Sequence, residues 1–126
     1  MRYLCVLGGG AVGSLLRYLA GVAIMSRWSG RFPLATFLIN VTGSFAIGLI
    51  ATLLADSTNP NWRPLLITGL LGGYTTFSSF EWEAFTSARG GAAGIAILYV
   101  LGSVVLGFLA CWLGVFVART LVGGRN

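Results

Sequence analysis

The sequence predicts an all-α membrane protein with four transmembrane helices per subunit, the third of them broken near the membrane centre. Hydrophobic residues make up 56% of the 126 positions, the mean hydropathy is +0.88, and only 9% of residues are charged. Soluble domains carry roughly 25% charged residues. A spanning helix needs about 20 mostly apolar residues, so four spans fit in a single domain, residues 1–126, with no room for a sizeable soluble domain.

Charge and composition exclude several classes of protein. The net charge is +5, but every basic residue is an arginine and most fall at predicted helix ends, where they meet lipid headgroups rather than nucleic acid. The chain has no histidine, and Cys5 and Cys111 both lie in apolar segments, so neither zinc chemistry nor a disulfide framework is indicated. Without a nucleophile–base pair or a cluster of metal ligands, the sequence does not indicate an enzyme.

The first span covers about residues 3–25. Gly9, Gly13, Arg17 and Gly21 recur every four residues, which places them on one helix face. Small residues at that spacing let another helix approach closely. Arg17 is costly against lipid, so it must face protein, water or a partner group. It either caps backbone carbonyls and snorkels to the interface, or it has a functional role; the sequence leaves both open.

The second span covers about residues 34–55 and begins after a connector that ends at Pro33, a residue suited to a first helical turn. A polar and small stripe repeats every four residues along it: Thr36, Asn40, Ser44 and Gly48. An amide within a membrane either joins helices or contacts a ligand. Taken alone, Asn40 favours the first role.

The third span, about residues 65–88, contains the run on which the functional hypothesis depends. Gly72 and Gly73 free the backbone from helical angles, and Thr75 and Thr76 follow directly. Non-helical backbone at membrane depth is tolerated only where it is buried in protein or lines a polar cavity. With the nearby hydroxyls of residues 78 and 79, the break predicts a binding or conduction site. The alternative is a glycine-weakened helix with ordinary packing hydroxyls.

The fourth span, about residues 92–121, follows a short loop, so it should lie antiparallel to the third. Tyr99, Ser103, Gly107 and Gly114 fall close to one of its faces. Tyr99 lies far from both helix ends, and a buried hydroxyl usually finds a hydrogen-bond partner. Glu81 and Glu83 lie near the far end of the third span. For Glu81 we expect solvation near the membrane interface, and for Glu83 such solvation is the alternative to a role in the site.

The arginines are almost evenly divided between the two sides of the membrane. Four spans place Arg2, Arg63, Arg119 and Arg125 on one side, and Arg27, Arg31 and Arg89 on the other. Orientation is set by such a bias over short loops, so the chain should insert either way up. We therefore expect an antiparallel, dual-topology homodimer with its two-fold axis in the membrane plane. The two helix breaks would then meet at the dimer centre and offer carbonyls to a cation.

Three motifs carry a resemblance to a known family: GGAVGSLLRY at residues 9–18, NVTGSF at residues 40–45 and GLLGGYTTFSSF at residues 69–80. With these motifs, and with Tyr99 and Ser103 on the fourth predicted helix, the chain resembles the Fluc (CrcB) family of fluoride channels over all four helices. The resemblance implies an antiparallel homodimer in the inner (plasma) membrane, with two pores and a structural central sodium ion, that exports fluoride passively from the cytoplasm. Its partners would be fluoride, a second copy and the lipid bilayer.

The resemblance also assigns the site residues. It implies sodium-binding backbone carbonyls at Gly72 and Thr75, and a vestibule charge at Arg17 and Glu83. The implied pore residues are Asn40, Phe77, Phe80, Ser78, Ser79, Tyr99 and Ser103. Two positions depart from the family pattern: Ser79 replaces a common threonine, and Gly107 replaces a second serine that some members have on the fourth helix.

The chemistry of the implied pore residues suits fluoride. Hydroxyl and amide donors can replace the water around this small anion, and the positive edge of a phenylalanine ring can contact it. Plain core packing is the alternative for the two phenylalanines. Two other classes of protein remain as alternatives: a small multidrug exporter, which needs an embedded acid that the first, second and fourth spans lack, and a helical subunit that only packs against partners.

Overall fold

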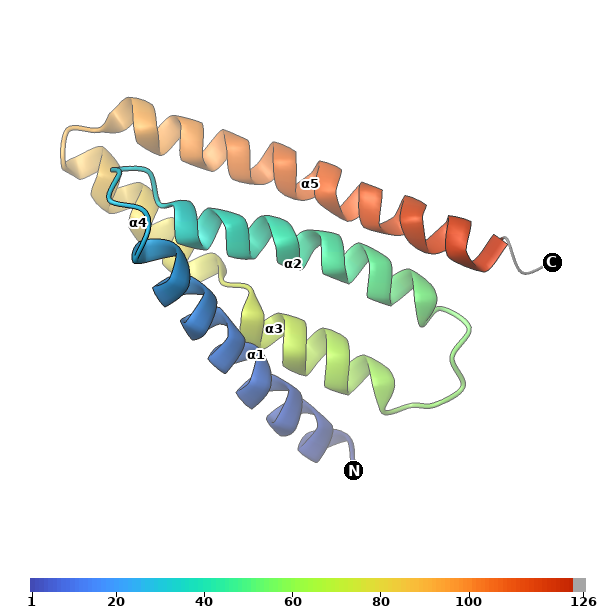
Figure 1. Cartoon of the computed structure of the whole chain (residues 1–126). Coiled ribbons are helices and arrows are strands. Elements are labelled where there is room, and N and C mark those ends of the chain that lie inside the picture. The colour runs from blue at the N-terminus through green and yellow to red at the C-terminus, as the bar shows by residue number, and fades with distance from the viewer. Residues whose placement is uncertain (124–126) are drawn as a thin grey trace.

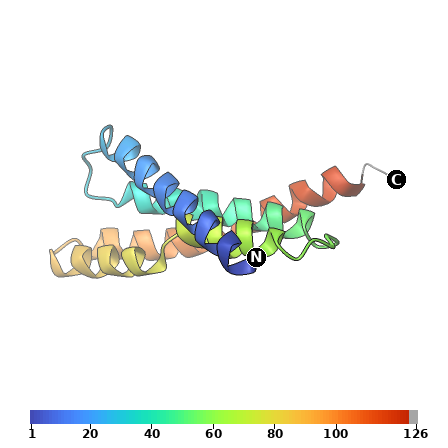
Figure 2. The same ribbon diagram turned by 90° about the horizontal axis from the view of Figure 1, so that it is seen from below.

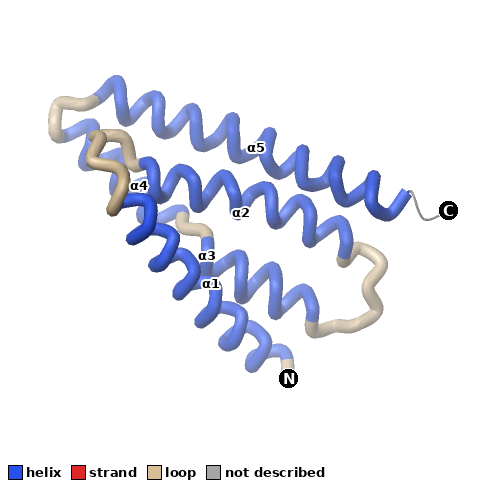
Figure 3. Tube along the Cα trace, viewed as in Figure 1, coloured by secondary structure: helices blue, strands red, loops and turns tan. Residues whose placement is uncertain are grey.

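The computed structural model describes residues 1–123, and every regular element in that range is a helix (Figures 1 and 3). Arg125, which entered the predicted charge balance, lies outside the described residues. The elements in chain order are α1 (Arg2–Met25), α2 (Leu34–Leu53), η1 (Arg63–Leu71), α3 (Gly72–Tyr74), α4 (Phe77–Arg89) and α5 (Ala93–Gly123).

Within residues 1–123, three helices are long and apolar enough to cross a membrane alone: α1, α2 and α5. Their positions agree with the first, second and fourth predicted spans. The third predicted span is not a single helix. It begins as the π-helical segment η1, continues into α3, and resumes as α4 after an interruption at Thr75 and Thr76. The predicted interruption of the third span is therefore present, and neither half of that span is long enough to cross a membrane alone.

The interruption does not lie at the glycine pair, so that part of the prediction is wrong. Gly72 has helical angles, with φ −64° and ψ −34°, and Gly73 continues the helix. The chain becomes extended at Thr75, with φ −83° and ψ 160°, and at Thr76, with φ −149° and ψ 121°. Threonine is β-branched and favours extended backbone, which makes this pair a better break than the two glycines.

The glycines instead permit close contact between helices. A Cβ added at Gly73 would lie 2.6 Å from the carbonyl oxygen of Gly10, and one at Gly9 would collide with the carbonyl oxygen of Leu65. Such contacts require residues without side chains. The predicted close approach is confirmed within the chain for Gly9 and Gly13 on α1, whereas no atom from the rest of residues 1–123 lies within 4 Å of a Cβ added at Gly21.

The helices form two packed pairs joined around the interruption. In Figure 1, α2 lies along α5, while α1 lies along η1 and α3. The helix α4 packs against α5, which confirms the predicted antiparallel pair, and Gly91 closes the turn between them with φ +81°. Figure 2 shows that the C-terminal end of α1 and the helix α4 diverge on one side of the molecule.

The interior of the chain is small and centres on one cluster. Phe80, Ala84 and Tyr99 are buried together, and Tyr99 is the largest side chain with no exposed surface. Most apolar side chains of α1 and α5 are exposed instead. Those surfaces are available to lipid or to another protein chain.

Candidate functional site

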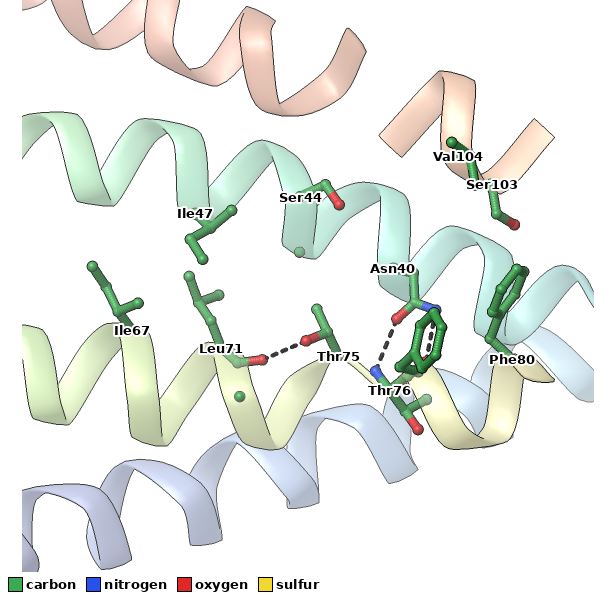
Figure 4. A pocket seen from close by; sticks show the side chains of 13 residues that line it. Asn40, Ser44, Ile47, Ile67, Leu71, Thr75, Thr76, Phe80, Ser103 and Val104 are labelled. Carbon is green, nitrogen blue, oxygen red and sulfur yellow. Dashed lines mark hydrogen bonds between the residues drawn. The ribbon is translucent and has the colours of Figure 1, made fainter. Parts of the chain in front are cut away.

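The interruption is held by paired hydrogen bonds from a single side chain. The Asn40 Nδ2 group donates to the Thr76 carbonyl oxygen at 2.9 Å, and the Asn40 Oδ1 atom accepts from the Thr76 N–H at 2.9 Å (Figure 4). In an unbroken helix that N–H would bond to the Gly72 carbonyl. Asn40 therefore satisfies both backbone groups of the residue at which the helix ladder fails, as the interior of a membrane demands.

The preceding residue is held from the other side by α1. The Arg17 Nη1 group donates to the Thr75 carbonyl oxygen at 3.3 Å, and the Thr75 hydroxyl donates to the Leu71 carbonyl oxygen at 2.9 Å. Arg17 thus caps a backbone carbonyl, which is one of the two roles left open by the sequence. Its guanidinium also lies beside the gap between α3 and α4.

A second contact fixes the end of α3 to α2. The Thr42 hydroxyl donates to the Leu38 carbonyl at 2.7 Å, so the Tyr74 hydroxyl must be the donor in the 3.0 Å bond between the two side chains. Beside this bond, a Cβ at Gly43 would collide with the Thr75 methyl group. The sequence Asn40–Ser44 therefore both supports the interruption and makes room for it.

Glu83 joins three helices rather than lying solvated at an interface. Its Oε1 atom accepts from the Thr36 hydroxyl of α2 at 2.8 Å, and its Oε2 atom accepts from the Tyr99 hydroxyl of α5 at 2.7 Å. Thr36 is 8% exposed and Tyr99 is fully buried. Of the two interpretations of Glu83, these hydrogen bonds favour a role within the protein over simple solvation at the interface, and its side chain is half-buried; Glu81, by contrast, is exposed.

A first cavity of about 390 Å³ lies beside the interruption, between α2, η1, α4 and α5 (Figure 4). Its polar wall includes Asn40, Ser44, Thr76 and Ser103, and the Ser103 hydroxyl is buried without a hydrogen-bond partner in residues 1–123. The apolar wall includes Phe77, which is 74% exposed, and Phe80, which is 6% exposed. Gly72 and Thr75 also line this cavity.

A second cavity lies where α1 and α4 diverge. It is lined by Arg17, Ser79 and Glu83, with Thr36 and Gly21 among the other lining residues. The Ser79 N–H bonds to the Thr76 hydroxyl, which caps the start of α4. One basic, one acidic and several hydroxyl groups therefore share this space.

The structure brings most of the predicted site residues to these two cavities. The first contains Asn40, Phe77, Phe80, Ser103, Gly72 and Thr75, and the second contains Arg17, Ser79 and Glu83. Tyr99 lines neither cavity but contacts the Phe80 ring and Glu83. Ser78 is exposed and lines neither cavity.

Sequence reasoning assigned no role to three further residues: Thr36, Ser44 and Tyr74. Thr36 and Ser44 are members of the four-residue stripe on α2, so their face was visible in the sequence, but their partners on α4 and α5 were not. A Cβ added at Gly107 would lie 3.5 Å from the Ser44 hydroxyl oxygen. A hydroxyl from α2 thus lies beside Gly107 on α5.

The chain is similar to known proteins over nearly its whole length. Residues 4–115 match the family model described as CrcB-like protein, Camphor Resistance (CrcB). A protein of Solibacter usitatus named fluoride-specific ion channel FluC is 53% identical over 121 residues, which cover 94% of this chain and 99% of that protein. Proteins of the same name from Acidobacterium capsulatum and Thermus thermophilus are 49% and 44% identical, and each match covers 97% of this chain. The matches cover 99% and 97% of those two proteins.

Proposed function

The chain belongs to the CrcB family, and from this membership we propose that it is a fluoride-selective ion channel through which fluoride leaves the cytoplasm passively. It is a multi-pass protein of a bacterial cell membrane, and its relatives are named as ion channels rather than enzymes. The observation that carries the proposal is the helix interruption at Thr75 and Thr76 with a cavity on each side of it.

The interruption places two helix ends of opposite polarity close together. The carbonyl end of the helix formed by η1 and α3 carries a partial negative charge, and the N–H end of α4 carries a partial positive charge. Anions are stabilised at helix N-termini by the same N–H groups. The start of α4 therefore favours fluoride, and the end of α3 favours a cation.

The first cavity supplies donors that suit a partly dehydrated anion. The Ser103 hydroxyl has no partner in the described part of the chain, and Asn40 Nδ2 has a second N–H beyond the one bound to Thr76. The rings of Phe77 and Phe80 lie 5.8 Å apart and border the same space. Ring edges are weakly positive, so they can contact an anion without binding it tightly. Weak contacts at several sites allow exit as well as entry.

The second cavity suits the role of a vestibule through which fluoride enters the conduction path. Arg17 raises the local potential for anions while its own hydrogen bond goes to the Thr75 carbonyl. Glu83 opposes entry of anions unless its charge is compensated, and the hydroxyls of Thr36 and Tyr99 compensate part of it. We propose that fluoride passes from this cavity along Ser79 and Phe80 towards Ser103.

We propose that Ser44 takes the place of the missing hydroxyl at Gly107. Ser44 lines the first cavity together with Ser103, and its oxygen lies beside Gly107. A hydroxyl offered from α2 can continue the row of donors that begins on α5. Substitution of Ser44 by alanine should then lower fluoride efflux more than substitution of the exposed Ser78.

We propose that two copies pair in an antiparallel homodimer with two pores. The even division of arginines supports insertion in both orientations. The largely exposed apolar surfaces of α1 and α5 leave room for a partner, and the first cavity is open along Gly72 and Phe77, both of which are exposed. A second copy placed there would close the cavity and bring the two interruptions together.

We also propose a structural sodium ion at the centre of that dimer. The Gly72 carbonyl fits such an ion because Asn40 takes the N–H that would otherwise occupy it, and the Thr75 carbonyl keeps one lone pair beside the one that accepts from Arg17. Both residues border the first cavity. Unwound carbonyls and helix C-terminal ends are the usual ligands of sodium in transporters. A single chain offers two such carbonyls, so the second copy would contribute the remainder. When bound, the ion would neutralise the carbonyl ends of the two half-helices.

The test is efflux from liposomes that contain the purified protein. We expect fluoride to leave much faster than chloride, and much faster than from protein-free liposomes. Equal rates for the two anions would refute a fluoride-selective channel. Replacement of external sodium should change efflux only slowly if the central ion is trapped between the protomers, whereas an immediate dependence on sodium would indicate coupled transport instead.

A further inference from the structure

The loop between α1 and α2 is exposed along residues 26–31, but it closes on itself and places Phe32, which is half-buried, against the interior of the chain. The Trp28 Nε1 group donates to the Phe32 carbonyl oxygen at 2.9 Å, and the Leu34 N–H donates to the same oxygen at 2.7 Å. A Cβ added at Gly30 would lie 2.5 Å from the Trp28 ring, so the indole lies directly across Gly30. The loop is therefore closed by Trp28, and its closure determines where Phe32 lies.

Phe32 is inserted into the aromatic cluster at the centre of the chain. Its ring lies edge-to-face against Tyr99, with centroids 5.5 Å apart and planes at 82°, and against Phe37, with centroids 5.3 Å apart and planes at 74°. On its other side Tyr99 contacts Phe80, with centroids 5.0 Å apart. These are the geometries that aromatic pairs prefer. A continuous series of rings thus connects the loop to the wall of the first cavity.

Tyr99 depends on these contacts for the position of its hydroxyl. A tyrosine ring has two torsions to fix, and here the ring lies between Phe32 and Phe80 with no exposed surface. In this position the hydroxyl donates to Glu83 at 2.7 Å. Phe32 lines neither cavity, so it contacts no ion in either space. Any influence that it has on conduction must act through Tyr99 and Phe80.

We propose that Phe32 is a positioning residue for the conduction path: its edge-to-face contact holds Tyr99 in the orientation that reaches Glu83 and so supports Phe80 at the cavity wall. The loop, closed by Trp28, thus acts on the site through the aromatic cluster and is not only a connector. This inference rests on the proposed fluoride channel. It concerns aromatic geometry, so bulk alone at position 32 is not sufficient.

The test compares fluoride efflux from liposomes for two substitutions at position 32. Phe32→Leu keeps an apolar side chain but removes the ring edge, and we expect efflux to fall by about fivefold, the scale of one lost edge-to-face pair. Phe32→Tyr keeps the ring and should retain most of the efflux. The matched control is Phe85→Leu on α4, where the ring is 52% exposed and lines neither cavity; its efflux should equal that of the wild type.

Each result decides the proposal. Unchanged efflux in Phe32→Leu would overturn it, as would equal losses in Phe32→Leu and Phe32→Tyr, which would indicate a need for Phe32 itself rather than for a ring edge. If Phe32→Leu does not remain a monodisperse protein, Trp28→Phe is used instead; it removes the bond to the Phe32 carbonyl and should lower efflux by about twofold. No loss in that variant would also overturn the proposal. A wild type that does not conduct fluoride refutes the channel itself and is seen before any variant is compared.

Discussion

Asn40 and Thr76 form a closed pair in which one carboxamide takes both the N–H and the C=O of one backbone residue, each at 2.9 Å. The pair makes it possible for a helix to stop within an apolar chain without leaving the backbone groups of Thr76 unpaired. The pair determines where the interruption lies, because the end of α3 and the start of α4 are separated at this residue. It therefore also determines where the partial negative charge of one helix end and the partial positive charge of the other are placed.

Substitution Asn40→Asp should destabilise the protein and abolish fluoride efflux. The aspartate keeps an accepting oxygen for the Thr76 N–H but places a second oxygen against the Thr76 carbonyl, at a cost of about 2 kcal/mol or more. Thermal unfolding in detergent and liposome efflux would measure the two effects. Asn59→Asp is the matched control, because Asn59 uses only its oxygen, which accepts from the Asn61 N–H. Equal stability of the two variants would contradict the prediction.

Substitution Glu83→Gln should reduce fluoride efflux by about tenfold, the effect expected when one charge-assisted hydrogen bond is lost. The amide retains one accepting oxygen while its NH2 group can only donate, so the hydroxyl of Thr36 or of Tyr99 must turn from donor to acceptor, and both bonds lose the carboxylate charge. Glu81→Gln, two residues away and exposed, removes the same charge and should leave efflux unchanged. If both variants conduct like the wild type, the three-helix junction at Glu83 has no part in conduction.

Substitution Phe80→Ile should suppress fluoride efflux by about tenfold or more while the proposed dimer remains intact. Isoleucine keeps an apolar side chain at a buried position but removes the ring that contacts Tyr99 and borders the first cavity. Size-exclusion chromatography checks assembly, and liposome efflux checks conduction. Phe85→Ile, at a ring of α4 that is 52% exposed and lines neither cavity, is the control. Unchanged flux in Phe80→Ile would remove Phe80 from the pore.

Substitution Gly9→Ala should lower stability by about 2 kcal/mol, the usual scale of an overpacked contact. The new methyl group would collide with the Leu65 carbonyl and lie 2.9 Å from the Leu70 nitrogen, and neither backbone atom can move aside easily. Gly8→Ala is a neighbouring control, because nothing in the chain lies within 4 Å of its added Cβ. A thermal midpoint of Gly9→Ala equal to that of Gly8→Ala would show that α1 and η1 are not in close contact.

The sequence by itself determined the membrane class, the four apolar stretches and the presence of an interruption in the third. Each of these depends on composition or on the local order of residues, because hydropathy and helix propensity act over one or two turns. The stripe on α2 from Thr36 to Gly48 was visible for the same reason. The motifs of residues 9–18, 40–45 and 69–80 also predicted the family, which the comparisons confirmed.

Only the tertiary structure decided where the interruption lies and which groups stabilise it. Gly72 and Gly73 have weak helix propensity, yet they remain helical because Gly73 packs against the backbone of α1. The chain becomes extended at Thr76 because Asn40, 36 residues earlier, is placed to accept and donate there. Glu83 likewise meets Thr36 and Tyr99 only through packing. Hydrogen bonds between helices depend on which faces meet, and no local pattern contains that information.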